Sequence, residues 1–236
     1  MQETDSDPGA PADIHADADP PVANRPADRR SARLQAMHEA RRAHVLAGAR
    51  EAFMALGLEG TSMREIAQRA GYTPGAIYSY FPGKEDIYAA LLGESLERLN
   101  AKVDTALATA HAPADRLRAG ARAFFGFYRD NPRDLDLGFY LFQGMKPRGL
   151  TPALDDALNV RLRDALQPVR SALRAMGMPA GAALAETTGL FAHVAGLLLL
   201  SHTGRIRMFG QDPQVLFDAY LEGLAGRAGS TAGAAR

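Results

Sequence analysis

Apolar residues recur at steps of three and four along most of this 236-residue chain, and this spacing predicts helices. Pro and Gly punctuate the pattern. Helices are predicted over 84–110, 113–130, 133–145, 152–177, 180–204 and 213–227. No stretch alternates in polarity for long enough to indicate a strand, and no repeat is visible. We therefore expect an all-α protein.

The segment 62–81 has its own, tighter pattern of caps and stops. Ser62, or Thr61 before it, can cap a first short helix, and Gly71 can supply the left-handed residue that ends it. A second helix opens with Thr73 as its N-cap and Pro74 at its first position, and it runs to Phe81, where Pro82 and Gly83 stop it. Two short helices joined by such a tight turn predict a helix-turn-helix motif.

The second of these helices has an apolar face and a nearly uncharged outer face. Ile77 and Phe81 are four residues apart, so both are expected in the core. The residues that point wholly or partly outward are Thr73, Gly75, Ala76, Ser79 and Tyr80, with Tyr78 at the edge. Small residues allow DNA to approach closely, and hydroxyl groups can donate to phosphates. Lys84, just past the helix, is placed to add one positive charge.

The run from Ala67 to Asp86, AQRAGYTPGAIYSYFPGKED, resembles the TetR family of bacterial transcription regulators. An upstream helix that ends at Gly57 resembles the first helix of that family's three-helix DNA-binding domain, so the match covers roughly residues 42–102. Tyr72 is a departure, because the family usually has a small aliphatic residue there. The resemblance implies DNA contacts from Ser62, Arg64, Thr73, Pro74, Gly75, Ala76, Tyr78, Ser79, Tyr80 and Lys84.

The pattern and the resemblance together imply a domain organisation. Residues 1–38 are predicted to be a disordered arm, acidic and then basic, because their first part is rich in Pro, Ala and Asp. Residues 39–102 form the DNA-binding domain, with the helix-turn-helix at 62–81. Residues 103–227 form a helical ligand-binding and dimerisation domain, and residues 228–236 are a disordered tail.

Charge is balanced overall, with 27 basic and 27 acidic residues, but it is unevenly placed. Residues 21–42 hold six arginines against two acidic residues, whereas residues 43–102 hold six basic and seven acidic residues. Phosphate attraction could therefore come from the arm, although a solvated charge run is the alternative. The first twenty residues contain six acids and no Lys or Arg, so no export signal is expected. The absence of Cys excludes disulfides and thiolate metal sites.

Residues 124–145 concentrate aromatic side chains. Such a wall, with polar groups on Tyr128, Tyr140 and Gln143, is suited to a pocket between helices, but ordinary core packing explains it equally well. The resemblance implies an inducer pocket in this region. We predict that its lining residues are Phe124, Tyr128, Phe139, Tyr140, Phe142 and Gln143.

Residues 187–204 contain no acidic residue, Lys or Arg. Two histidines, internal glycines and a short apolar core argue against a membrane span. Gly189, Ala192 and Gly196 form a strip of small residues that allows close helix approach, so we expect an interface helix. Members of the resembled family dimerise through their last two large helices, which implies a homodimer through the segments 180–204 and 213–227.

Enzyme motifs such as G-x-S-x-G and H-E-x-x-H are absent, so no catalytic activity, cofactor or metal is expected. The sequence favours a homodimeric repressor in the bacterial cytoplasm, associated with the nucleoid. It would bind a palindromic double-stranded operator and be released by a small apolar or aromatic effector, with no membrane partner. A constitutive DNA-binding regulator, or a helical binding or enzymatic module with a purely structural helix-turn-helix, remains an alternative.

Overall fold

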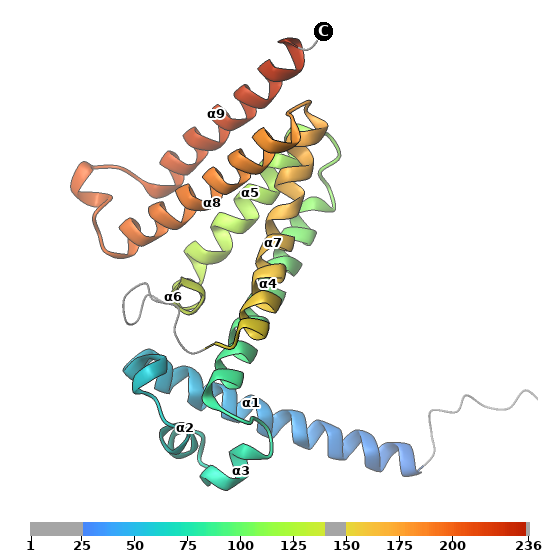
Figure 1. Cartoon of the computed structure of the whole chain (residues 1–236), viewed down its shortest axis with the longest axis vertical. Helices are drawn as coiled ribbons and strands as arrows, with labels where there is room; N and C mark the ends of the chain where they lie inside the picture. The colour runs from blue at the N-terminus through green and yellow to red at the C-terminus, as the bar shows by residue number, and fades with distance from the viewer. Residues whose placement is uncertain (1–25, 140–149, 235–236) are drawn as a thin grey trace, which may run out of the picture. The chain divides into compact units, whose positions relative to one another are not determined.

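A computed structural model of the chain describes residues 26–139 and 150–234, with side chains from 29 to 138 and from 150 to 230 (Figure 1). The helices are α1 (Pro26–Gly60), α2 (Met63–Ala70), α3 (Pro74–Tyr78), α4 (Lys84–Leu107), α5 (Pro113–Asp130), α6 (Pro132–Phe139), α7 (Pro152–Ala175), α8 (Ala180–His202), the short 3-10 helix η2 (Arg207–Phe209) and α9 (Pro213–Ala234). No strand occurs among the described residues. The all-α prediction is confirmed.

Two segments predicted to be disordered are helical where they are described. Helix α1 begins at Pro26, so the prediction of disorder is wrong for residues 26–38, and α9 continues to Ala234 instead of stopping near 227. The Pro and Asp content that suggested disorder is confined to the start of the arm. Residues 29–41 are rich in Arg, Ala, Leu, Gln, Met and Glu, which are good helix formers. Residues 1–25 and 235–236 lie outside the described ranges.

The chain divides into two compact units, Met1–Arg41 and Arg42–Arg236. The second unit contains both the helix-turn-helix and the C-terminal bundle, so the predicted division at residue 102 does not separate compact bodies. The reason is α4, which runs without a break from Lys84 to Leu107 across the predicted boundary. Its buried side chains include Ile87 near its start and Val103 near its end. One helix therefore belongs to the cores of both regions.

Helices α1 and α2 cross at a point that only glycine allows. A Cβ atom on Gly48 would lie 2.7 Å from the backbone nitrogen of Ala70 and 2.9 Å from its Cα. These are backbone atoms and cannot rotate away. The contact brings α2 against the apolar face of α1, where Val45, Ala49 and Phe53 are buried. The orientation of the helix-turn-helix on its supporting helix thus depends on Gly48.

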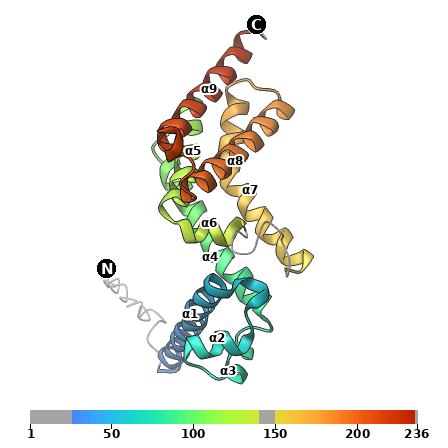
Figure 2. The same cartoon turned by 90° about the vertical axis from the view of Figure 1, so that its left-hand side faces the viewer.

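The C-terminal bundle is built around α5, which packs against α4, α7, α8 and α9. Helices α8 and α9 lie side by side and run in opposite directions in both views (Figures 1 and 2). By length and composition alone, α8 is apolar enough to cross a membrane. In the bundle, however, its residues Leu190, Val194 and Leu198 are buried against neighbouring helices.

Candidate nucleic-acid interface

The turn between α2 and α3 forms as its sequence predicts. Gly71 is left-handed at φ 72°, and the Tyr72 N–H donates to the carbonyl of Ala67 at 2.9 Å, which closes the end of α2. Tyr72 itself is half-buried against the core. The larger side chain is therefore accommodated at the edge of the domain while the turn keeps its predicted caps.

Each of the two short helices begins with a residue whose side-chain hydroxyl oxygen accepts a backbone hydrogen bond. The hydroxyl proton is not used in this bond. Ser62 Oγ accepts a hydrogen bond from the Glu65 N–H at 3.1 Å, and Thr73 Oγ1 accepts one from the Ala76 N–H at 3.3 Å. Each hydroxyl can still donate its own proton, because these bonds use only oxygen lone pairs. Both residues are exposed. They can cap a helix and contact a phosphate at the same time.

Helix α3 is shorter than predicted and ends at Tyr78, not at Phe81. The N–H groups of Tyr80 and Phe81 both donate to the Ile77 carbonyl, at 2.8 and 3.0 Å, which tightens the last turn. Pro82 prevents any continuation beyond Phe81, because a proline disfavours helical conformation in the residue before it. Ile77 and Phe81 are buried as predicted, so α3 is anchored at its middle and just beyond its end.

The outward face of α3 contains the predicted small and hydroxyl residues. Thr73, Pro74, Gly75, Tyr78 and Ser79 are exposed, whereas Ala76 and Tyr80 are half-buried. Ser79 differs from the expectation, because its hydroxyl donates to the Ala76 carbonyl at 2.7 Å and its proton is used within the helix. Tyr78 is the prominent group, with 56% of its surface exposed.

Lys84 has a structural role that the sequence pattern did not indicate. Its ammonium donates to two backbone carbonyls, those of Glu59 at 3.2 Å and Thr61 at 3.0 Å. These carbonyls lie at the end of α1 and in the turn before α2. Lys84 therefore ties the start of α4 to the turn that precedes the motif, in addition to its predicted contact with DNA. Arg64, by contrast, is exposed in α2.

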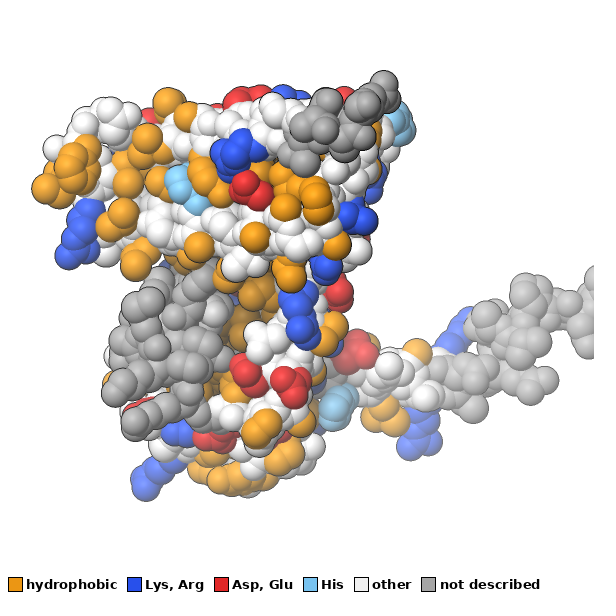
Figure 3. All heavy atoms as spheres, turned by 45° about the horizontal axis from the view of Figure 1, so that its top comes forward, with side chains coloured by type: hydrophobic (Ala, Val, Ile, Leu, Met, Phe, Trp, Pro, Cys, Tyr) orange, Lys and Arg blue, Asp and Glu red, His pale blue; other side chains and the backbone are white. Residues whose placement is uncertain are grey.

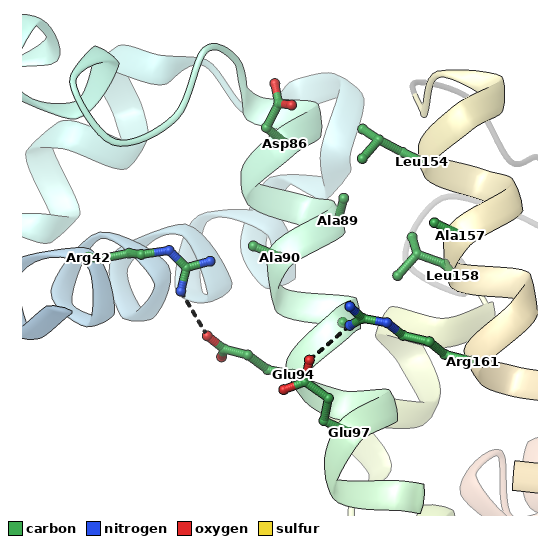
Figure 4. Close-up of a pocket in the computed structure, with 11 residues that line it drawn as sticks. Arg42, Asp86, Ala89, Ala90, Glu94, Glu97, Leu154, Ala157, Leu158 and Arg161 are labelled. Atoms are coloured by element: carbon green, nitrogen blue, oxygen red, sulfur yellow. Dashed lines mark hydrogen bonds and ion pairs between the residues drawn. The ribbon is translucent and has the colours of Figure 1, made fainter. Parts of the chain in front are cut away.

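Arg42, counted above with the basic arm, belongs to the folded domain. Its guanidinium lies 5.1 Å from the centre of the Phe81 ring and 3.5 Å from the carboxylate of Glu94 on α4. Figure 4 shows this pair at one side of a groove of about 410 Å³ between α1, α4 and α7. On the other side, Arg161 of α7 binds Glu97 at 2.9 Å. Two successive turns of α4 are thus linked by charge to α1 and to α7.

Two of the six predicted ligand-lining residues have described side chains, and both lie in the core. Phe124 and Tyr128 are completely buried, and their rings meet edge to face with centres 5.4 Å apart. Burial raises the pKa of the Tyr128 hydroxyl well above its ordinary value, with a smaller contribution from Asp134. Their role as ligand-lining residues stays a prediction. Tyr140, Phe142, Gln143 and the side chain of Phe139 lie outside the described residues.

Part of the small-residue strip predicted as a dimer interface on α8 packs against α9 of the same chain. A Cβ on Gly189 would lie 3.3 Å from the hydroxyl of Tyr220 on α9, so Gly189 faces the neighbouring helix. Ala192 is exposed, and a Cβ on Gly196 would meet nothing within 4 Å. Figure 3 shows hydrophobic side chains spread over the face formed by α8 and α9. Ala192 and Gly196 are therefore not covered by α9, whereas Arg227 of α9 and Glu186 of α8 form an ion pair at 2.8 Å.

Family models match most of the chain between residues 45 and 224. Residues 45–91 match the N-terminal model described as bacterial regulatory proteins, tetR family. Residues 117–224 match the model described as tetracyclin repressor-like, C-terminal domain.

Curated relatives match mainly in the N-terminal part. The chain is 35% identical over 112 residues to the HTH-type transcriptional activator FasR of Mycolicibacterium smegmatis, covering 48% of this chain and 50% of the relative. It is 39% identical over 61 residues to the transcriptional repressor KstR of the same organism, covering 26% of this chain and 30% of that one. The matches thus span half or less of these relatives' lengths.

Solved structures share the fold over a longer stretch. A regulatory protein of the tetR family from Rhodococcus RHA1 superimposes with a TM-score of 0.59 at 23% identity, covering 80% of this chain and 97% of that one. The regulator FadR from Bacillus subtilis, solved with stearoyl-CoA, gives 0.60 at 18% identity and covers 77% and 96%. At these identities the likeness concerns the fold.

Proposed function

The chain belongs to the tetR family of bacterial regulatory proteins, and on this premise we propose that it is a homodimeric, ligand-responsive transcription regulator that acts on DNA in the cytoplasm. A repressor of a palindromic operator is the favoured form. The named relatives include an activator as well as a repressor, so the sign of regulation is a separate measurement.

The observation that carries the proposal is the outward face of α3. It is held by the buried residues Ile77 and Phe81, and it exposes hydroxyl and small side chains with no charge of its own. Such a face can approach the major groove closely and contact phosphates, but it offers few donors to base edges. Sequence preference should then rest on DNA shape and on contacts with thymine methyl groups.

Helix α4 is the proposed route from an effector to the DNA. It starts three residues after Phe81, is tied by Lys84 to the turn before α2, and continues into the bundle against α5 and α7. A ligand that moves α5 or α7 would therefore move the end of α4 that holds α3. Because two half-sites must meet successive major grooves, about 34 Å apart, a small change in the spacing of the α3 helices breaks simultaneous binding.

A constitutive regulator is the second candidate, since the packing of Phe124 on Tyr128 is also that of an ordinary core pair. The two candidates differ in whether the binding of an effector and the binding of DNA influence each other. A switch requires that DNA weakens effector binding by the same factor by which the effector weakens DNA binding. Calorimetric titration of a small apolar or aromatic ligand, with and without operator DNA, separates them. If the ligand affinity differs with and without operator DNA, the switch is supported. If the two affinities are equal for every ligand that binds, the protein is a constitutive regulator.

A third class, a helical module with a structural helix-turn-helix, is tested by DNA binding itself. Site selection from random duplexes should enrich inverted half-sites, and the affinity should fall steeply with salt. A chain that enriches no sequence would contradict the proposed function in all its forms.

A further inference from the structure

The turn between α8 and α9 exposes two large apolar side chains on a fixed scaffold. Met208 and Phe209, within η2, have 74% and 72% of their surface exposed. The preceding residue Ile206 is buried in the core, and its carbonyl accepts the Phe209 N–H at 3.1 Å. The turn is therefore anchored with its two apolar side chains outward. Two adjacent large apolar side chains that an anchored turn holds outward are suited to contact with a partner.

A groove that fits such side chains lies between α7 and α8. It has a volume of about 310 Å³ and includes Leu162 and Leu166 of α7 with Leu184 and Phe191 of α8. Leu184 is half exposed, although it is one of the larger apolar residues of α8. Arg163, Asp164 and Arg170 also line it, and a guanidinium can cover an aromatic ring. The groove is mainly apolar, so an apolar occupant is favoured over a charged one.

The groove and the turn of one chain lie at opposite ends of α8. Residues 184 and 202 are separated by about 27 Å at 1.5 Å per helical residue, so a chain cannot fill its own groove. A second copy can. Within the unit Arg42–Arg236, α3 lies at one end and α8 and α9 lie toward the other, with their outer face on the side that Figure 2 turns to the viewer (Figures 1 and 2). Two copies that present α3 to one duplex are related by a two-fold axis along this direction.

That axis determines where the partner's turn lies. Helix α8 starts beside α7 and runs obliquely across the bundle to the α8–α9 turn on the far side (Figure 1). A half-turn about an axis through the open small-residue face of α8 and α9 exchanges the two sides. It therefore carries the partner's turn to the side of α7, whose residues line the groove together with those of α8.

We propose that Met208 and Phe209 of each copy insert into the α7–α8 groove of the other copy. The inference rests on the dimer of the proposed function, and it adds a specific contact outside the helix-to-helix face. Because α7 packs along α4, this contact also ties one chain's turn to the helix that supports its partner's α3. The groove is then an interface site and not the place of the effector.

Cysteine cross-linking tests this contact directly, because the natural chain contains no Cys. One chain carries Phe209→Cys and a differently tagged chain carries Leu184→Cys; in a second mixture Leu162→Cys replaces Leu184→Cys. Each chain has a single thiol, so every disulfide joins two chains. After subunit exchange and mild oxidation, we expect a covalent heterodimer from at least one mixture. Phe209→Cys alone should give none, and neither should Phe209→Cys mixed with Met54→Cys in the DNA-binding region.

The outcomes separate this inference from the dimer itself. Light scattering first gives the mass of the natural chain in solution. A dimer without a disulfide in either mixture, or with one in Phe209→Cys alone, would overturn the insertion and leave the proposed function standing. A monomer would overturn both the dimer and the insertion. A second readout is the dimer dissociation constant, which Phe209→Ser should raise by about tenfold or more and Met54→Ser should leave unchanged.

Discussion

Helices α3 and α5 both carry a tyrosine residue, but one is exposed and the other is buried. Tyr78 has 56% of its surface exposed, whereas Tyr128 is 1% exposed and packs edge to face on Phe124. An exposed ring forgoes the hydrophobic free energy that burial would give. We infer that α3 keeps its aromatic group for a partner, while α5 uses its aromatic groups to hold the bundle together.

The comparison predicts that a substitution in one of the two helices changes the free energy of unfolding, whereas a substitution in the other changes the affinity for DNA. Changes in the aromatic core of α5 should lower the free energy of unfolding. Changes on the outer face of α3 should leave that free energy nearly unchanged and weaken DNA binding.

Phe124→Ala should destabilise the protein by about 3–5 kcal/mol, because it removes a completely buried ring and leaves a cavity. Thermal or urea unfolding measures this loss. Phe191→Ala is a milder companion, since that ring is only half-buried and lies 6.1 Å from Phe124. Normal stability in Phe124→Ala, together with altered effector affinity, would show that this ring lines a pocket and would break the comparison.

Gly48→Ala should cost about 1–3 kcal/mol, because the new methyl group would meet the backbone of Ala70 at 2.7 Å and force α2 away from α1. DNA affinity should fall with stability. Gly75→Ala is the matched control, since a Cβ there meets nothing within 4 Å. The melting temperature of Gly75→Ala should equal or exceed that of the natural protein, but this variant should still bind DNA less tightly. Equal melting temperatures for the two variants would contradict the crossing argument.

Lys84→Ala should lower stability by about 1–2 kcal/mol, because two carbonyls next to the motif lose a charged donor. Arg64→Ala removes a positive charge of the same predicted interface from an exposed position, and it should leave the melting temperature unchanged. Both should weaken DNA binding. If Lys84→Ala melts like the natural protein, its role is confined to DNA, and the structural tie described above is not significant.

Tyr78→Phe should have the smallest effect, a loss of DNA affinity of about 1 kcal/mol with no change in unfolding. The loss should be similar for operator and random duplexes, because a phosphate contact carries no sequence information. Fluorescence anisotropy with both duplexes gives the two affinities. A loss confined to the operator would place this hydroxyl on a base edge instead.

The sequence predicted α3 better than the bundle because the motif is determined locally. The Ser62 and Thr73 caps, the left-handed Gly71 and the buried pair Ile77 and Phe81 are set by residues a few positions apart, and all of them are confirmed. The end of α3 is the exception, because the helix stops at Tyr78 and not at Phe81.

Features that depend on distant contacts could not be predicted in this way. Neither the approach of Gly48 to Ala70 nor the bonds of Lys84 to the turn before α2 leaves a periodic signal in the sequence. The same holds for Phe124 and Tyr128, whose spacing suits a pocket wall and a packed core equally well. Only the positions of α4 and α8 around them decide between the two.

The central claim is that the outer face of α3 binds DNA. The most direct measurement is selection of duplexes from a random pool by the purified natural chain, followed by the same selection with Thr73→Ala and Tyr78→Phe. We expect enrichment of two inverted half-sites with centres about 10 base pairs apart or a multiple of that, and weaker retention of the same sites by both variants. Absence of any enriched site, or retention of one with full affinity by both variants, would contradict the account.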